Sequence, residues 1–296
     1  MKILITGGTG FIGSALCNEL LKDKNNEITI LSRSKDITST KITIINNLNN
    51  LEKDASYNII INLAGEPIAD KKWSREQKQK IVESRINTTE SIIEFIKNST
   101  EKPELLISGS AIGYYGIEQS NTDHDENDTS DDSFSSQLCK QWESVALQAN
   151  TYGVRTCILR TGIVLGKNGG ALRKMLMPFK MGLGGKIGSG KQWMSWIHLD
   201  DLVGIIMHCI KQNDVKGPVN GTAPNPISNN SFTKALGKAL RRPTFFPMPK
   251  IVIKILMGQM GTELLLSGKK ILPIKALESG YQFKYATLDS ALNNII

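Results

Sequence analysis

The sequence predicts an α/β protein with a doubly wound parallel sheet, followed by a smaller and mainly helical C-terminal lobe. Through about residue 160, short β-branched runs alternate with longer segments whose apolar residues recur at helical spacing. A glycine-rich turn at residues 7–13 directly follows the first apolar run. After Arg160 the chain becomes rich in glycine and proline, which divide it into shorter elements. Strand, helix and strand at this spacing are typical of parallel strands joined by crossover helices.

The periodicity predicts each element of the first part in turn. The expected strands are Lys2–Thr6, Glu27–Leu31, Lys41–Ile45, Asn58–Leu63, Leu105–Ser108 and Thr156–Leu159. The expected helices are Phe11–Leu21, Ser74–Lys97 and Ser133–Ala149. A later helix over His198–Cys209 is expected to return to the main sheet, and the tail from Ser231 is expected to form several short helices.

Composition narrows the class of protein. The chain has 296 residues, 36 Lys and Arg against 28 Asp and Glu, and a net charge of +8. A chain of this length buries roughly three quarters of its unfolded surface, so its core needs neither disulfides nor metals. The cysteines lie far apart, and no Cys or His spacing fits a metal site. We interpret the cysteines as reduced core residues and expect a cytoplasmic protein without a metal centre.

The charge pattern bears on the partners. Lysines are scattered along the chain and residues 123–132 are strongly acidic, whereas a nucleic-acid-binding surface is clustered. The N-terminus shows no signal-peptide pattern, and no run approaches the roughly 18 apolar residues of a membrane span. We therefore expect no nucleic-acid partner and no membrane partner, while a homodimer stays open.

Three glycines, Gly7, Gly10 and Gly13, stand between the first expected strand and the first expected helix. That is the context of a dinucleotide-binding fingerprint. The first glycine makes the tight turn, the second lets backbone N–H groups approach a pyrophosphate, and the third lets helix and strand pack closely. The predicted cofactor contacts here are Gly7, Thr9, Gly10, Phe11, Ile12 and Gly13.

The end of the second strand indicates which dinucleotide binds. An NAD site usually has a carboxylate there to bind the ribose 2′-hydroxyl, but this chain has Ser32 and Arg33. A guanidinium binds a 2′-phosphate through paired hydrogen bonds, and a serine hydroxyl adds a donor. NADP(H) is therefore favoured over NAD(H); the alternative is that Arg33 is a solvated surface residue.

The fourth strand ends in Leu63, Ala64 and Gly65, whose small side chains let the backbone run close to a nucleotide; the alternative is a plain strand-ending turn. With the segments Arg160–Gly166 and Trp196–Asp201, the chain resembles the extended short-chain dehydrogenase/reductase superfamily. Its proline-containing tail is similar to a C-terminal domain of unknown function found in an atypical branch of the NAD-dependent epimerase/dehydratase family. The resemblance implies a Rossmann sheet and places Gly162 beside the nicotinamide.

The change in residue pattern after Arg160, with a helix expected to return at His198–Cys209, predicts a domain division. Residues 1–165 form the dinucleotide-binding domain, to which residues 195–222 return, and residues 166–194 and 223–296 form the smaller lobe. A cleft between two lobes is the usual place for a small-molecule substrate.

The catalytic pattern of that superfamily is missing from this chain. The resemblance implies a Tyr followed four residues later by a Lys, and no Tyr in this chain has that neighbour. When Glu143 is aligned with the acidic residue that often follows this pair, the Tyr and Lys positions hold Ser135 and Cys139. Ser110, after the fifth strand, matches the serine that binds a substrate oxygen, although a strand cap is equally consistent with it. Tyr114 is the second candidate acid, and the alternative is that it anchors its loop.

Arg85 is a further departure, because extended members usually carry Asn at this position of the helix after the fourth strand. An arginine there reaches either the cofactor or a surface ion pair. Two classes of function remain open. The first is an NADP(H)-dependent oxidoreductase or epimerase-like enzyme that acts on a small carbonyl, hydroxyl or nucleotide-sugar substrate with a non-standard proton donor. The second is a non-catalytic NADP(H)-binding regulatory or sensor protein.

Overall fold

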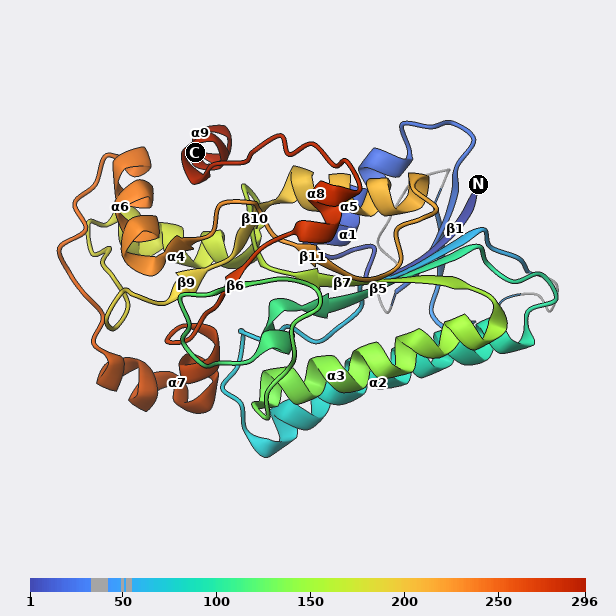
Figure 1. The fold of residues 1–296 in the computed structure, drawn as a ribbon, viewed down its shortest axis with the longest axis horizontal. Coiled ribbons are helices and arrows are strands. Elements are labelled where there is room, and N and C mark those ends of the chain that lie inside the picture. The colour runs from blue at the N-terminus through green and yellow to red at the C-terminus, as the bar shows by residue number, and fades with distance from the viewer. Residues whose placement is uncertain (33–41, 49–50, 52–54) are drawn as a thin grey trace.

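A seven-stranded parallel sheet forms the centre of the molecule (Figure 1). The computed structural model describes residues 1–32, 42–48, 51 and 55–296. The strand order is β11-β7-β5-β4-β1-β2-β3. Their bounds are β1 Lys2–Thr6, β2 Glu27–Leu31, β3 Ile42–Ile45, β4 Ile59–Asn62, β5 Leu105–Ala111, β7 Arg155–Thr161 and β11 Gly217–Gly221. The order reverses between β1 and β4, and in such sheets ligands bind at that switch point, beyond the carboxyl ends of the strands.

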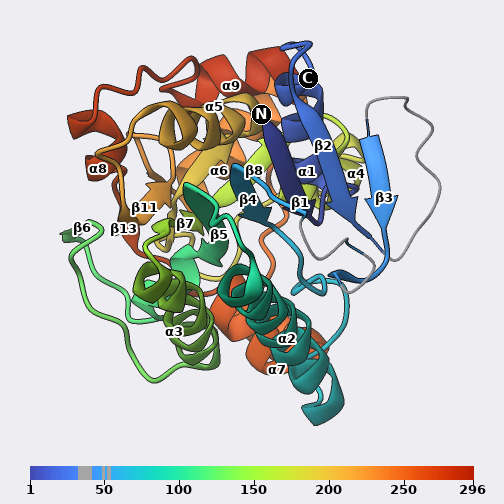
Figure 2. The same ribbon diagram turned by 90° about the vertical axis from the view of Figure 1, so that its right-hand side faces the viewer.

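Helices cover both faces of this sheet, as Figure 2 shows. On one face lie α1 (Phe11–Leu20) and α5 (Leu199–Lys211), whose apolar residues form one core with the side chains of Ile3 and Ile5. On the other face lie α2 (Arg75–Asn98) and α3 (Phe134–Leu147), which belong with Leu4 to a second apolar layer. Because successive side chains of a strand point to opposite faces, β1 contributes to both cores, as a doubly wound sheet requires. The predicted fold class is confirmed.

The second lobe has its own core. It is built from α4 (Gly170–Lys180), α6 (Asn229–Leu240) and α9 (Leu288–Ile295), which enclose the buried side chains of Trp196 and Phe232. Two short sheets join the lobe to the rest of the chain. They are β8 (Ile163–Gly166) with β10 (Trp196–His198), and β9 (Trp193–Met194) with β12 (Ile227–Ser228).

The tail crosses back to the first domain after α6. Helix α7 (Lys250–Leu264) lies below the sheet in Figure 1, and its Met260 packs with Trp73, Ile81 and Leu138 near α2 and α3. Strand β13 (Lys270–Ile271) then pairs with β6 (Asp123–His124), before the short helix α8 (Ile274–Glu278). The C-terminal segment is thus fixed to both parts of the molecule.

Several elements differ from the sequence expectation. Helix α4 is not predicted, because it lies in a glycine-rich stretch and contains Pro178. The continuous segment Arg160–Gly166 is interrupted at Gly162, which separates β7 from β8. The sequence pattern also did not predict two short 3-10 helices, Ile112–Tyr115 and Gln148–Tyr152. Within the described residues, no helix is long and apolar enough to cross a membrane.

Candidate functional site

The turn after β1 has the geometry that the glycine pattern predicts. Gly7 has a φ of +68°, a conformation that side chains other than glycine rarely adopt, and the Gly10 N–H donates to the Gly7 carbonyl at 3.0 Å. A Cβ on Gly13 would lie 2.2 Å from the Gly7 oxygen, so only glycine lets α1 begin this close to the turn. The two outer glycines therefore shape the turn itself.

The N-terminus of α1 suits a phosphate group. Gly10 is the N-cap, it offers no side-chain cap, and the first turn of the helix contains no acidic residue. A helix start of this kind leaves backbone N–H groups and a positive partial charge for an anion. The arrangement fits the pyrophosphate of a dinucleotide, with exposed Thr9 in the turn leading to it.

Two predicted contacts of this turn point their side chains elsewhere. Ile12 packs against the core of the sheet. The ring of Phe11 lies against the backbone of Gly169 and Gly170, where an added Cβ would approach it to 2.5 Å and 2.9 Å. Only the backbone of Phe11 and Ile12 is left to serve an anion at the helix start.

The end of β4 runs directly against the glycine turn. The Thr6 hydroxyl donates to Asn62 Oδ1 at 2.6 Å, and the Ala64 N–H donates to the same hydroxyl at 3.1 Å. The Leu63 N–H bonds the Thr6 carbonyl at 3.1 Å, and a Cβ on Gly7 would lie 2.7 Å from Leu63 backbone atoms. The predicted contacts of β1 and β4 are therefore held side by side at the switch point of the sheet.

Arg85 lies beside Gly65. Its Nη1 donates to the carbonyls of Glu66 and Ile81 at 3.1 Å and 2.9 Å, and its guanidinium lies 5.3 Å from the Trp142 ring. A Cβ on Gly65 would lie 2.9 Å from the guanidinium carbon, so the glycine makes room for it. Burial lowers the pKa of Arg85, while nearby Cys139 and Glu66 oppose that shift. Among the described residues, Arg85 forms no surface ion pair.

The remaining predicted cofactor contacts lie around this edge. Ser32 follows β2, and its N–H donates to the Ile45 carbonyl at 2.9 Å. Arg33 lies outside the described residues. Gly162 donates its N–H to the Gly221 carbonyl at 2.9 Å, and an added Cβ would lie 2.5 Å from the Ser195 oxygen. Packing against those two segments is sufficient reason for glycine at position 162.

Ser110 belongs to a buried charged group at the end of β5. Its hydroxyl donates to Glu143 Oε1 at 2.6 Å. The same carboxylate receives Arg160 Nε and Nη2, each at 2.9 Å. Ser110 and Arg160 are register partners on β5 and β7, while Glu143 comes from α3. Ser110 and Glu143 are each 5% exposed and Arg160 is 2% exposed, so the ion pair is shielded from water.

Two tyrosines complete this group. The Tyr114 ring lies 3.5 Å from the Arg160 guanidinium carbon. The buried Tyr115 accepts from Arg160 Nη1 at 3.0 Å and donates to Asn220 Oδ1 at 2.7 Å. Burial opposes the charge of Arg160, but the Glu143 carboxylate and Tyr115 outweigh it, so the pKa of the guanidinium is raised. The two sequence candidates, Ser110 and Tyr114, thus share contact with one buried Glu143–Arg160 pair.

The residues at the usual Tyr and Lys positions make other contacts. Ser135 donates both its N–H and its hydroxyl to Glu263 of α7, at 3.0 Å and 2.6 Å. The Cys139 thiol lies 3.6 Å from the Ala111 carbonyl, and burial raises its pKa to about 11, with the Glu143 charge adding to the shift. A thiol of this kind stays protonated at neutral pH and is a poor nucleophile.

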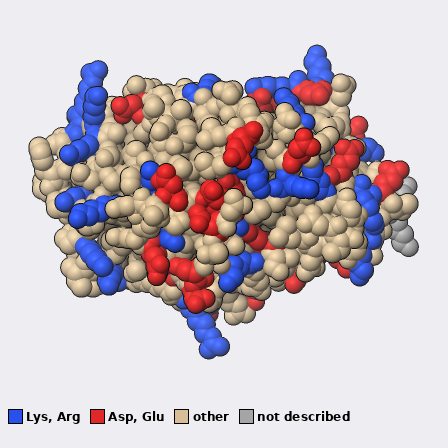
Figure 3. Space-filling view, viewed as in Figure 1, with Lys and Arg blue, Asp and Glu red and all other residues tan. Residues whose placement is uncertain are grey.

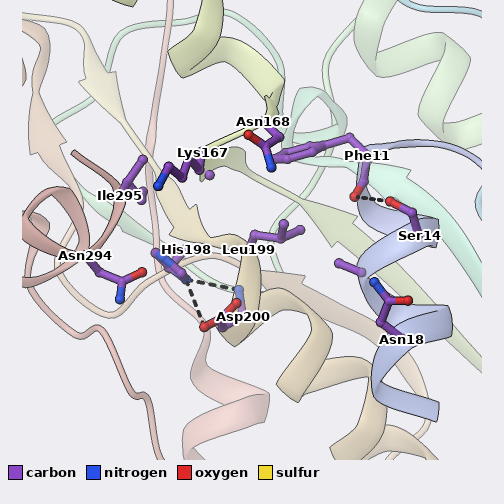
Figure 4. A pocket seen from close by; sticks show the side chains of 12 residues that line it. Phe11, Ser14, Asn18, Lys167, Asn168, His198, Leu199, Asp200, Asn294 and Ile295 are labelled. Carbon is purple, nitrogen blue, oxygen red and sulfur yellow. Dashed lines mark hydrogen bonds and ion pairs between the residues drawn. The ribbon is translucent and has the colours of Figure 1, made fainter. Parts of the chain in front are cut away.

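A cavity of about 300 Å³ lies between α1, the start of α5 and the end of α9. Figure 4 shows Phe11, Ser14 and Asn18 of α1 on one side of it and His198 and Asn294 on the other. Neither Ser110 nor Tyr114 lines this cavity. The cavity is therefore distinct from the buried group that surrounds Ser110.

Sequence reasoning did not assign a role to Glu143, Arg160 or Glu263. Glu143 serves in the sequence only to align the missing Tyr and Lys, and Arg160 stands inside an apolar strand. A charged residue within a strand of otherwise apolar character is the signal that a buried partner exists. No comparable signal marks Glu263, because its contact with Ser135 depends on the path of the tail.

The switch-point location, the glycine turn and the uncapped helix start define a dinucleotide-binding protein of the Rossmann type. The chain belongs to the NAD dependent epimerase/dehydratase family, whose model matches residues 3–220. Residues 248–295 match a domain of unknown function, DUF1731. The expected resemblance, including its tail, is confirmed.

Individual relatives extend over the whole chain. An Arabidopsis thaliana protein called epimerase family protein SDR39U1 homolog, chloroplastic, is 40% identical over 100% of this chain and 87% of its own length. Bacillus subtilis epimerase family protein YfhF is 36% identical, over 100% and 98%. The crystal structure of human epimerase family protein SDR39U1 with NADPH is similar with a TM-score of 0.89 and 34% identity, over 100% and 99%.

Proposed function

We propose that this protein is an NADP(H)-dependent oxidoreductase, or an epimerase-like enzyme, that acts on a small molecule with a hydroxyl or carbonyl group. The observation that carries the proposal is the hydrogen bond from Ser110 to the buried Glu143. The human relative whose structure was solved with NADPH supports the choice of cofactor.

The residues that would hold the cofactor are those around the switch point. The backbone of residues 7–13 would bind the pyrophosphate, Ser32 and Arg33 the 2′-phosphate, and residues 63–65 with Arg85 and Gly162 the rest of the molecule. When bound, NADP(H) would supply hydride transfer to or from a carbon of the substrate.

Ser110 would carry the proton. Its hydroxyl hydrogen is directed at Glu143 Oε1, so its oxygen lone pairs are left to accept a proton from a substrate hydroxyl. The serine proton would then move to Glu143, and the reverse sequence would protonate a substrate oxygen during reduction. Arg160 holds the carboxylate in place through two hydrogen bonds. The Tyr114 hydroxyl would be the second group that bonds the substrate oxygen.

A non-catalytic sensor remains the second candidate. It is favoured by Ser135 and Cys139, which stand where the superfamily has its Tyr and Lys and which both bond to protein groups. The two functions differ in a simple experiment. Purified protein is incubated with NADPH and, separately, NADP⁺ against panels of carbonyl compounds, alcohols and nucleotide sugars. Turnover with any of them establishes the enzyme; tight NADPH binding without turnover across the panels supports the sensor.

A further inference from the structure

One end of the molecule is rich in positive charge. Residues 167–199 and 215–262 contain thirteen lysines and arginines and no aspartate or glutamate, whereas the whole chain has a net charge of only +8. The rest of the chain is therefore net acidic. In Figure 3, blue side chains predominate at the left end, where one red group lies at the upper edge, and most red side chains lie in the middle and at the right. That left end holds α4, α6 and α7 in the same view (Figure 1).

The same end exposes large apolar side chains. Six of them follow one another between residues 245 and 256, and three lie between residues 177 and 183. Phe245 is 81% exposed, Ile255 is 70% exposed and Met177 is 67% exposed. Single exposed apolar residues are ordinary, but a group this large marks an interaction site. We call residues 177–183 and 245–256 the cationic apolar end.

The two segments of this end form one surface. Arg242 Nε donates to the Lys180 carbonyl at 3.0 Å, and the Phe246 N–H donates to the Gly184 carbonyl at 3.3 Å. Met248 continues the contact, because its N–H donates to the Lys186 carbonyl at 2.9 Å. The end of α4 and the residues after it are thus joined to the segment that leads into α7. The exposed residues of α7 include Lys250, Ile251, Lys254 and Ile255.

We propose that the cationic apolar end binds the surface of a lipid bilayer that contains anionic headgroups. An interfacial membrane site requires apolar side chains flanked by lysines and arginines. The apolar side chains enter the boundary of the acyl region, while the cationic side chains pair with the headgroups. The association is peripheral, because no helix among the described residues could span the bilayer. This inference departs from the expectation of no membrane partner, which rested on the absence of a signal-peptide pattern and of a run of roughly 18 apolar residues, and so did not address peripheral binding.

The charge also argues against other occupants. A second copy of this chain would present the same cations and the same absence of carboxylates, so two such faces would repel each other. Nucleic acid would satisfy the cations but would leave the exposed aliphatic side chains of α7 without an apolar partner. An anionic bilayer satisfies both.

Vesicle cosedimentation tests the proposal with the intact protein. Vesicles of phosphatidylcholine alone are compared with vesicles that also contain about 30 mol% phosphatidylglycerol, in about 0.1 M and about 0.5 M NaCl. We expect at least tenfold tighter binding to the anionic vesicles at the lower salt concentration, with most of the difference lost at the higher one. Equal binding to both vesicles, or to neither, overturns the proposal.

Three paired variants separate the parts of the surface. Lys250→Glu with Lys254→Glu, and Phe245→Ser with Phe246→Ser, are each expected to weaken binding at least tenfold. The matched control is Lys2→Glu with Lys24→Glu, which reverses two exposed lysines outside the cationic apolar end and should bind like the unchanged protein. Circular dichroism melting shows whether each variant is folded, and a loss of binding equal in the control overturns the proposal.

Two further measurements identify a wrong occupant. Light scattering that shows a dimer lost in the Phe245→Ser/Phe246→Ser variant would assign the surface to a second copy. Salt-dependent binding to duplex DNA that this variant retains, without vesicle binding, would assign it to nucleic acid. NADPH binding plays no part in these readouts, so the result is independent of the proposed enzyme function.

Discussion

The Ser110 hydroxyl and the Glu143 carboxylate lie 2.6 Å apart, although 33 residues separate them in the chain. Ser110 lies near the carboxyl end of strand β5, and Glu143 projects from α3 on the face below it. Arg160, one strand further along the sheet, holds the carboxylate with two parallel hydrogen bonds. Ser110 therefore belongs to a buried charged group and is not an isolated strand cap.

The first prediction concerns that serine. Ser110→Ala removes the hydroxyl but leaves the Glu143–Arg160 pair intact, so the protein should fold and bind NADPH with nearly unchanged affinity. Turnover should fall by roughly 10²–10⁴-fold, the usual effect of losing a positioned acid or base. Single-turnover oxidation of bound NADPH measures the effect. Ser108→Ala, on the same strand and also buried, is the matched control and should retain activity.

Tyr114 allows a separate test. Tyr114→Phe keeps the ring that stacks on Arg160 and removes only the hydroxyl, so folding should be little affected. If this hydroxyl bonds the substrate oxygen, turnover in the same single-turnover assay should fall by roughly 10²–10⁴-fold. Full activity in both Tyr114→Phe and Ser110→Ala would leave a bound water as the proton donor. A severe loss in Cys139→Ser alone would instead indicate thiol chemistry.

The sequence was sufficient for six of the seven strands of the sheet and for the glycine turn, because these depend on local pattern; β11, whose residues are Gly-Pro-Val-Asn-Gly, was not predicted. Gly7 needs a positive φ and Gly13 needs the absence of a side chain, and each requirement is visible as a glycine at fixed spacing. The buried group of Ser110, Glu143 and Arg160 could be predicted only in part. Ser110 could be placed at the end of a strand, but its partner Glu143 is fixed by how α3 packs below β5 and β7, which no spacing in the chain specifies.

The tail shows the same limit. Nothing near Ser135 in the sequence announces Glu263, which lies 128 residues later and arrives through the docking of α7. The gathering of basic side chains at one end is a further example. Lys180 and Arg242 lie 62 residues apart in the chain, and only the fold brings them into contact.

The glycine turn gives the third prediction. A Cβ at position 10 would meet only the Gly7 oxygen, at 3.2 Å, whereas one at position 13 would meet the same atom at 2.2 Å. Gly10→Val should therefore fold, yet its side chain would occupy the place of a pyrophosphate and abolish NADPH binding in calorimetry. Gly13→Ala should instead lower the melting temperature. Unchanged NADPH affinity in Gly10→Val would show that the turn does not bind the cofactor.

The fourth prediction concerns the choice of dinucleotide. If Ser32 and Arg33 bind the 2′-phosphate, each charge-assisted hydrogen bond should contribute on the order of 1.5–3 kcal/mol, so NADPH should bind at least tenfold more tightly than NADH. Arg33→Ala should remove most of that preference and leave NADH affinity unchanged. Titration calorimetry with both cofactors measures it. Equal affinities in the unchanged protein would contradict the assignment.

The last prediction concerns His198, the N-cap of α5. Its Nδ1 accepts the Asp200 N–H at 3.0 Å, and its ring stacks on Tyr285 with centroids 3.9 Å apart. Burial lowers its pKa below the ordinary value of 6.5, although Asp200, Asp201 and the Asn294 side chain oppose that shift, and Lys284 adds to it. The folded protein therefore favours the neutral ring, which is also the form that can accept the capping hydrogen bond.

A depressed folded pKa fixes the sign of the pH dependence. The stability that neutral His198 contributes is present in full above the unfolded pKa near 6.5, and it is lost as the pH falls through the lower folded value. Asparagine also caps helices but does not titrate, so His198→Asn should keep the cap and flatten this part of the curve. Urea unfolding between about pH 8 and pH 5 measures the free energy of unfolding of both proteins. Parallel curves for the two would show that His198 does not titrate with folding, and a steeper decline in the variant would reverse the assigned sign.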